Sequence, residues 1–240
     1  MICRGCNQDK KLVRAHIIPE SFFRELRSEE GTLKLVTNTK GVYTKRAPIG
    51  VYDQEILCKD CEDLFQEVDD YAAKILLNSD NHEELLHYGK LAGYRIKNIN
   101  YILLKRFVIS LLWRASISKQ NFYKKVNLGP IEARAKKLIW DKSSGEKHEF
   151  SFVLAKFDDT GTYSKIVLDP LQERWFGKRY YRFYLGGYIL YVKVDSQETP
   201  SEWIQFIPSD NDLIIVSRGD LLKSKEYPVL VNVVKVNKKI

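Results

Sequence analysis

The sequence predicts an α+β fold with a cysteine-containing N-terminal module, central helices and a mostly antiparallel β-sheet in its C-terminal part. Three observations support this prediction. All cysteines lie in two C-x2-C pairs, apolar residues follow a helical period between residues 62 and 140, and β-branched and aromatic residues dominate the runs after residue 145. With 44% hydrophobic residues among 240, the chain can form a sizeable core.

The two cysteine pairs are Cys3–Cys6 and Cys58–Cys61. Two residues between cysteines allow both sulfurs to lie on one side of the backbone, and two such pairs form a tetrahedral four-thiolate site that suits Zn²⁺ and is closed to substrate. We therefore expect a structural zinc held by Cys3, Cys6, Cys58 and Cys61. Disulfides or a redox-active pair are the alternatives. Because 51 residues separate the pairs, the metal would join two distant segments.

The segments around the cysteine pairs are expected to be short strands and loops. Gly5 permits a tight turn inside the first pair. We expect a strand over residues 11–14, a short helix that begins near Pro19, an irregular stretch over residues 28–50, and a strand over residues 51–57 that leads into the second pair.

A helix is expected from Glu62 onwards, because apolar residues then recur at i, i+3 and i+4. These residues are Leu64, Phe65, Val68, Tyr71, Ala72, Ile75 and Leu76. Further helices are expected over residues 83–94, within residues 98–126 and over residues 131–140. The helix within residues 98–126 is apolar on nearly every side, so we expect it in the core.

The C-terminal part is expected to be a sheet, because its runs are rich in β-branched and aromatic residues between turn signals. The expected strands cover residues 150–157, 163–168, 182–194, 203–207, 213–216 and 229–236. Gly186-Gly187 is a turn signal within one of these runs.

A domain boundary is expected near residue 80. It separates the cysteine module, residues 1–80, from the helices and sheet of residues 81–240. The net charge of +8 is distributed unevenly, since residues 1–80 contain 12 Lys and Arg against 14 Asp and Glu, whereas residues 81–240 contain 27 against 17. A basic surface favours polyanionic partners. The alternative is a solvated surface that keeps the protein soluble.

The sequence favours a soluble cytoplasmic protein with no membrane partner. Cys3 lies so close to the first residue that we expect no signal peptide before it. The most apolar run, residues 101–113, is interrupted by Lys105 and Arg106 and is too short to span a bilayer. Cysteines confined to C-x2-C pairs suit a reducing compartment.

Three motifs together resemble the HNH endonuclease family in its zinc-stabilised form, which has a treble-clef-like ββα-metal fold. They are Cys3-x2-Cys6, Ala15-His16-Ile17-Ile18-Pro19 and Asp53-x4-Cys58-x2-Cys61-Glu62. The resemblance covers about residues 1–75. The remainder, including residues 111–116 and 126–129, looks like uncharacterised bacterial HNH-like proteins.

The resemblance implies a catalytic site beside the zinc. His16 would be the general base for attack of water on a phosphodiester, and one Mg²⁺ or Mn²⁺ ion would stabilise the developing charge. Asp53 takes the place of the family's Asn, which orients the His, and Glu62 takes the place of a metal-binding His or Asn. Asp53 and Glu62 could both ligate Mg²⁺. Ala15 stands where the family has a metal-binding Asp or His, and alanine ligates nothing.

Each candidate residue also has a structural interpretation. His16 can brace the Ile-Ile-Pro turn, Glu62 can favour the N-terminus of a helix, and Asp53 can be a turn residue at a strand end. The adjacent Asp69 and Asp70 are expected on a solvated helix face.

Two basic and aromatic segments also have two interpretations. Trp113 and Arg114 are expected to be a core residue and a satisfied buried charge rather than a contact for nucleic acid. Residues 174–182 interleave cations with aromatic rings, which can bind single-stranded nucleic acid. We favour an amphipathic strand whose rings face the core.

Two functions follow from these observations. The first is an HNH-like metal-dependent endonuclease, which the resemblance links to bacterial restriction or phage defence, with DNA as the expected substrate and a C-terminal part that recognises substrate or a protein partner. The position of His16 between the cysteine pairs favours it. The second is a catalytically degenerate zinc-binding module that binds nucleic acid or a protein partner, and Ala15 favours that alternative.

Overall fold

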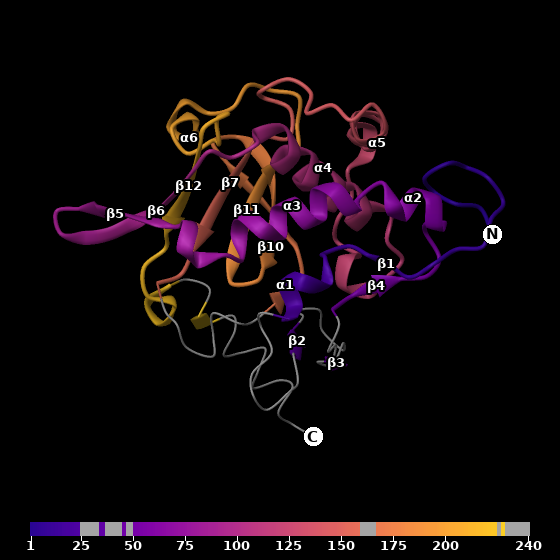
Figure 1. The fold of residues 1–240 in the computed structure, drawn as a ribbon, viewed down its shortest axis with the longest axis horizontal. Helices are drawn as coiled ribbons and strands as arrows, with labels where there is room; N and C mark the ends of the chain where they lie inside the picture. The colour runs from indigo at the N-terminus through magenta and orange to yellow at the C-terminus, as the bar shows by residue number, and fades with distance from the viewer. Residues whose placement is uncertain (25–33, 37–44, 47–49, 159–166, 225–226, 229–240) are drawn as a thin grey trace.

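The computed structural model describes residues 1–24, 34–36, 45–46, 50–158, 167–224 and 227–228 (Figure 1). These residues form a mixed α+β structure, as predicted. Its largest part is a seven-stranded sheet in the order β5-β6-β12-β7-β11-β10-β9, in which neighbouring strands are antiparallel except for the parallel pair β12 and β7. The strands are β5 (Glu83–His87), β6 (Lys90–Lys97), β7 (Phe152–Lys156), β9 (Leu171–Trp175), β10 (Lys178–Leu185), β11 (Tyr188–Lys193) and β12 (Asp212–Ser217).

Residues 83–94 form most of a β-hairpin, so the prediction of a helix there was wrong. His87 of β5 pairs with Lys90 of β6. The two residues between them, Tyr88 and Gly89, have φ angles of 48° and 71°. Positive φ at both central residues is the requirement of a type I′ turn, which connects the two antiparallel strands of a hairpin. Figure 1 shows the hairpin projecting from the edge of the sheet.

The two faces of the large sheet bury different sets of side chains, because neighbouring residues of a strand point to opposite faces. In β11, Leu190 and Val192 belong to the larger core, whereas Ile189 and Tyr191 belong to a smaller apolar cluster. The short helix α6 (Ser201–Ile204) contributes Trp203 to that smaller cluster. The prediction of a strand over residues 203–207 was therefore wrong. Trp203 lies in the helix α6 and packs against the sheet.

The helix α4 (Tyr101–Ile117) lies in the larger core, as its apolar sequence predicts. It begins at Asn100, whose side chain accepts a hydrogen bond from the backbone N–H of Leu103 at 3.1 Å, which is an N-cap. It ends at Ile117, so it fills only part of residues 98–126, the stretch within which a helix was expected. Trp113 is buried there, which confirms its predicted place in the core.

The remaining helices pack around α4 and lead to the cysteine pairs. The predicted helix after the second pair is present but divided in two, because Leu64 and Phe65 separate its halves. These helices are α1 (Glu20–Arg24), α2 (Lys59–Asp63), α3 (Gln66–Leu76) and α5 (Glu132–Trp140). Figure 1 shows α3 and α4 over one face of the large sheet and α2 at the end of the molecule that carries the N-terminus.

Two small sheets complete the described structure. The pair β1 (Ala15–His16) and β4 (Tyr52–Asp53) is antiparallel. The second small sheet has the order β3-β2-β8 and consists of β2 (Lys34–Val36), β3 (Lys45–Arg46) and β8 (Val167–Leu168).

Several predicted strands differ in extent from those observed. The strand expected over residues 11–14 is replaced by β1 and by a single bridge between Leu12 and Cys58. The strand expected over residues 51–57 is shortened to β4. The run of residues 182–194 is divided at Gly186-Gly187, where both φ angles are positive. The strand over residues 229–236, most of the irregular stretch 28–50 and part of the strand 163–168 lie outside the described residues.

One continuous core contains residues from both sides of the expected boundary near residue 80. Cys3 and Ile56 belong to it together with Leu112 and Leu190. The division into residues 1–80 and 81–240 stays a prediction. None of the helices in the described part of the chain has the length and hydropathy of a membrane-spanning segment.

A buried ion pair joins α3 to α4. The Arg114 guanidinium, whose side chain is 0% exposed, donates to the Asp69 carboxylate at 2.8 and 2.7 Å and to the backbone carbonyl oxygen of His16 at 2.8 Å. Arg114 is thus the satisfied core charge that the sequence predicts. Asp69 is not on a solvated face, whereas Asp70 is exposed.

Asp69→Asn should lower the free energy of unfolding by about 3–5 kcal/mol, because it leaves the buried Arg114 charge without its counter-ion. Urea unfolding would measure the change. The matched control is Glu83→Gln, which breaks the exposed Lys97–Glu83 pair and should cost less than about 1 kcal/mol. Equal losses in the two variants would contradict the role of the buried pair.

A second ion pair makes a pH-dependent contribution to stability. Arg134 on α5 donates to both carboxylate oxygens of Glu149, at 2.7 and 2.8 Å. These bonds, aided by the backbone N–H of Glu146, lower the pKa of Glu149 to about 2. Since the folded-state pKa lies below the ordinary value, the stabilisation is present above about pH 4.5 and is lost as the pH falls towards 2.

Glu149→Gln should therefore lower the free energy of unfolding by about 1–2 kcal/mol at pH 7, where Arg134 is partly exposed and solvent weakens the pair. The difference from the wild type should shrink between pH 4.5 and pH 2 in urea unfolding. Glu55→Gln, at the exposed Lys119–Glu55 pair, is the control. A difference that does not change with pH would refute this assignment.

Candidate metal centre

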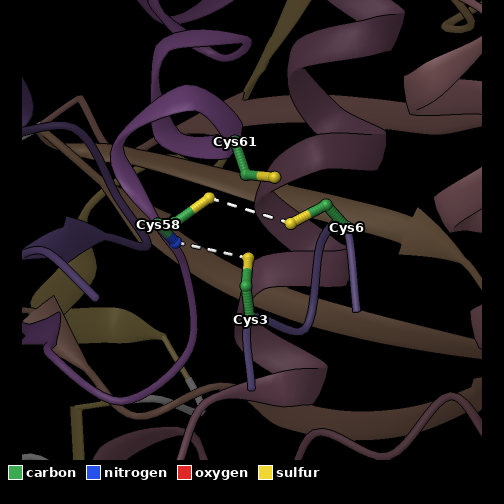
Figure 2. A group of neighbouring side chains, drawn as sticks. All are labelled: Cys3, Cys6, Cys58 and Cys61. Carbon is green, nitrogen blue, oxygen red and sulfur yellow. Dashed lines mark hydrogen bonds between the residues drawn. The ribbon is translucent and has the colours of Figure 1, made fainter. Parts of the chain in front are cut away.

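The first cysteine pair lies in a tight loop near the N-terminus. Residues Ile2 and Asp9 close the loop as an antiparallel bridge, and the backbone N–H of Asn7 donates to the carbonyl oxygen of Cys3 at 2.9 Å. Asn7 has φ of 59°, a left-handed conformation that asparagine tolerates well. The turn places Cys3 and Cys6 on one side of the loop (Figure 2).

The second pair lies at the start of α2. Cys58 is the N-cap residue of this helix and Cys61 lies within it. Two backbone hydrogen bonds tie this segment to the first pair, from Arg4 N–H to the Ile56 oxygen and from Val13 N–H to the Leu57 oxygen, both at 2.8 Å. The backbone therefore brings together two pairs that are far apart in the sequence.

The four sulfur atoms converge, with all of them within 4.8 Å of one another. The Sγ atoms of Cys6 and Cys58 are 3.9 Å apart, and the backbone N–H of Cys58 donates to the Sγ of Cys3 at 3.3 Å (Figure 2). A disulfide requires about 2.05 Å between sulfurs, and all four cysteines are free. Zn–S bonds of about 2.3 Å in a tetrahedron place sulfurs about 3.8 Å apart. This cluster could hold a metal such as zinc.

The surroundings of the sulfurs favour ionisation of one thiol. Burial alone would raise the pKa of Cys3, but backbone N–H groups of Cys6, Cys58 and Gly5 lower this pKa to about 6. Burial raises the pKa of Cys58 and that of Cys61. A bound cation would favour the thiolate form of all the cysteines.

Gly5 is required for the close approach of the loop to α2 and α5. A Cβ atom at this position would lie 2.6 Å from the Sγ of Cys61 and 3.0 Å from the ring of Trp140. Lys136 on α5 also donates to the carbonyl oxygen of Arg4 at 2.7 Å. The loop of the first pair is thus packed directly against α5.

The residues expected to form a catalytic site lie on β1, β4 and α2. His16 is on β1, and its strand pairs with β4 so that Ala15 is opposite Asp53 and His16 is opposite Tyr52. The backbone N–H of His16 donates to Glu62 Oε1 at 3.3 Å. The structure therefore brings His16 and Glu62 together, through the backbone of the histidine.

Glu62 lies in a largely buried place on α2. Its Oε2 atom is buried and has no hydrogen-bond partner among the described residues. Burial raises the pKa of Glu62 to about 7, although the nearby positive charge of Arg114 acts in the opposite direction. The buried oxygen and raised pKa of Glu62 do not fit the interpretation in which it is only an exposed acidic residue that favours the N-terminus of α2.

Asp53 is fully buried, and both of its carboxylate oxygens are hydrogen-bonded to protein groups. One oxygen accepts from the backbone N–H of Glu55 at 2.9 Å. The other accepts from the Ser118 hydroxyl at 3.0 Å and from the Lys119 backbone N–H at 2.7 Å. This geometry favours the structural interpretation, in which Asp53 holds the strand end and ties it to the C-terminus of α4.

A second metal site is not found among the expected residues. In the described part of the chain, the four cysteines are the one group of three or more His, Cys, Asp or Glu side chains placed to hold a metal ion. Ala15 is fully buried opposite Asp53. Binding of Mg²⁺ or Mn²⁺ by Asp53 and Glu62 therefore has no support in this geometry.

Sequence reasoning missed Asp69 as a partner of the site. Its carboxylate binds Arg114, which also holds the carbonyl oxygen of His16. A signal was present, because Asp69 follows Phe65 by four residues and precedes Ala72 by three, and both are buried. The helical period thus placed Asp69 on the buried side of α3.

Comparisons with known proteins identify no relative of this chain. No protein-family model matches it, and neither a curated protein nor a solved structure is similar to it beyond chance.

Elemental analysis of the purified chain should find one zinc ion per molecule. The variant Gly5→Ala should weaken zinc binding by about tenfold or more, because the added Cβ atom would displace the sulfur of Cys61. Competition with a chromogenic chelator would measure the affinity. Gly89→Ala is the matched control, since Gly89 has φ of 71° and nothing within 4 Å. It should strain a remote turn and leave zinc affinity unchanged. Zinc-free protein, or equal affinities in both variants, would refute the assignment.

Proposed function

We propose that this protein is a zinc-stabilised nucleic-acid-binding protein, built on a treble-clef-like ββα-metal module whose described residues form no catalytic metal site. The observation that favours binding over catalysis is the Asp53 carboxylate, whose two oxygens already accept three hydrogen bonds from protein groups. Binding a hydrated Mg²⁺ there would require these bonds to break, and the neighbouring Ala15 offers no ligand.

The arrangement around the sulfurs supports the ββα-metal part of the proposal. One cysteine pair lies in a loop, the other lies at the start of α2, and the antiparallel pair β1–β4 lies between them in the chain. This order resembles that of HNH endonucleases. Zinc in such a centre would act only as a structural ion, because four thiolates leave no position for substrate.

The charge of the chain supports a polyanionic partner. Its net charge is +8, and residues 81–240 contain 27 Lys and Arg against 17 Asp and Glu. Such a surplus attracts nucleic acid through release of its counterions. The cysteine module itself has a small acidic surplus, so we assign the contact to residues 81–240.

The proposal predicts binding without cleavage. Fluorescence anisotropy with labelled DNA and RNA, in single-stranded and duplex form, should show an affinity that falls steeply between 50 and 200 mM salt, about tenfold or more. Supercoiled plasmid incubated with Mg²⁺ or Mn²⁺ should remain intact. Absence of binding to every nucleic acid would refute the proposal and would point to a protein partner instead.

The contact between His16 and Glu62 favours a second candidate, an HNH-like nuclease of the kind that the resemblance links to restriction or phage defence. His16, which the resemblance gives as the general base, lies on β1, and its backbone N–H donates to Glu62 Oε1 at 3.3 Å. In the same plasmid assay, a nuclease would nick the wild type, and His16→Ala would lower the rate by about 10²–10⁴-fold. That result would replace the binding proposal with an enzyme.

A further inference from the structure

The hairpin of β9 and β10 carries the basic and aromatic stretch of residues 174–182. Its rings mostly face inward, as predicted, since Tyr180 and Tyr181 are fully buried. The turn between Trp175 and Lys178 consists of Phe176 and Gly177, whose φ angles of 49° and 73° are again those of a type I′ turn.

Two arginines lie side by side on one face of this hairpin. Arg179 of β10 is the direct cross-strand partner of Arg174 of β9. Directly opposed residues have Cβ atoms about 4.5–5.5 Å apart on the same face, and like charges at such positions destabilise a sheet. Arg174 is exposed and makes no hydrogen bond or ion pair with the described residues. An anion between the two guanidinium groups would remove this repulsion.

Two carboxylates in the sequence and structure around this arginine pair, those of Glu173 and Asp195, are held by other groups. Glu173 pairs with Arg182, at 3.1 Å, and alternation along β9 places it on the face opposite to Arg174. Asp195 accepts from the backbone N–H of Arg179 at 2.9 Å and from the buried Lys193 ammonium at 3.0 Å. The Arg179 guanidinium itself donates to one backbone carbonyl, that of Val194, at 3.1 Å.

An exposed aromatic ring lies next to this arginine pair. Phe176 is 56% exposed at the tip of the hairpin. Its neighbour Trp175 is anchored against Tyr191 and Trp203, with ring centroids 4.7 and 5.1 Å apart. The exposed Phe176 ring therefore lies at the tip of a hairpin that the packing of Trp175 holds against the sheet.

We infer that the tip of the β9–β10 hairpin binds single-stranded nucleic acid, with Arg174 and Arg179 on a backbone phosphate and Phe176 stacked on an unpaired base. Arginine presents a planar fork that matches phosphate oxygens, and base stacking on an aromatic ring requires an unpaired strand. This inference rests on the proposed function and assigns its contact surface.

The test is fluorescence anisotropy of the full zinc-loaded chain with a labelled 15-nucleotide oligo-dT across a salt series. The double variant Arg174→Gln, Arg179→Gln should lower the slope of log Kd against log salt by about 0.7, which is the contribution of one lost phosphate contact on a single strand. Phe176→Asn should weaken binding about tenfold at constant slope, since it removes the ring but keeps a residue that tolerates positive φ. Lys90→Ala, which removes an exposed cation from β6 near the opposite edge of the sheet, should change affinity less than about twofold.

The outcomes separate this inference from the proposal beneath it. If the wild type does not bind any nucleic acid, the proposed function and this inference both fail. If the wild type binds but the three hairpin substitutions leave affinity and slope unchanged, the contact lies elsewhere and only the inference fails. Equal losses on a duplex and on oligo-dT would overturn the single-strand assignment. Circular dichroism and thermal melting confirm that each variant is folded.

Discussion

The buried guanidinium of Arg114 determines how the N-terminal segment sits on the rest of the molecule. Arginine stays charged under all ordinary conditions, so a buried arginine requires partners for its donors. Here the partners come from three elements, namely the Asp69 carboxylate of α3, the His16 carbonyl of β1 and the Ser110 carbonyl within α4. A shift of any of these elements would leave charge or donors unsatisfied in the core. The position of β1 beside α3 is therefore specified by the hydrogen bonds and ion pair of Arg114 and not only by apolar packing.

The sulfur cluster is supported in the same way by groups outside it. Trp140 of α5 packs against Trp113 of α4 with ring centroids 5.2 Å apart, and against Phe65 at 6.5 Å. The same Trp140 ring limits the space at Gly5. The loop of the first cysteine pair thus packs against α5, a helix of the remainder of the chain, and this contact helps to explain how one core includes residues from both sides of position 80.

Local patterns allowed some features to be predicted from the sequence, and long-range contacts decided the others. The C-x2-C spacing predicted the cysteine cluster, and the all-round apolar run predicted the buried α4. The hairpin of β5 and β6 was missed because Glu83-Glu84-Leu85-Leu86 lacks the alternation of a half-buried strand, whereas the pairing of β6 with β12 settles its structure. The role of Asp53 could not be read locally, since two of its three donors belong to Ser118 and Lys119. For Asp69, the helical period was informative, but its cationic partner lies 45 residues away.

The position of β12 has a consequence for how the chain acquires its structure during synthesis. This strand lies between β6 and β7 and is the single link that joins the β5–β6 hairpin to the rest of the large sheet. It leaves the ribosome roughly 115 residues after β6 is complete. Until then the edge of β6 that pairs with β12 is open, and Ile96, which is buried in the complete fold, lacks its cross-strand partner Leu213. Unpaired edges of this kind are where nascent chains associate wrongly, so the nascent chain is most vulnerable before its last described strand emerges.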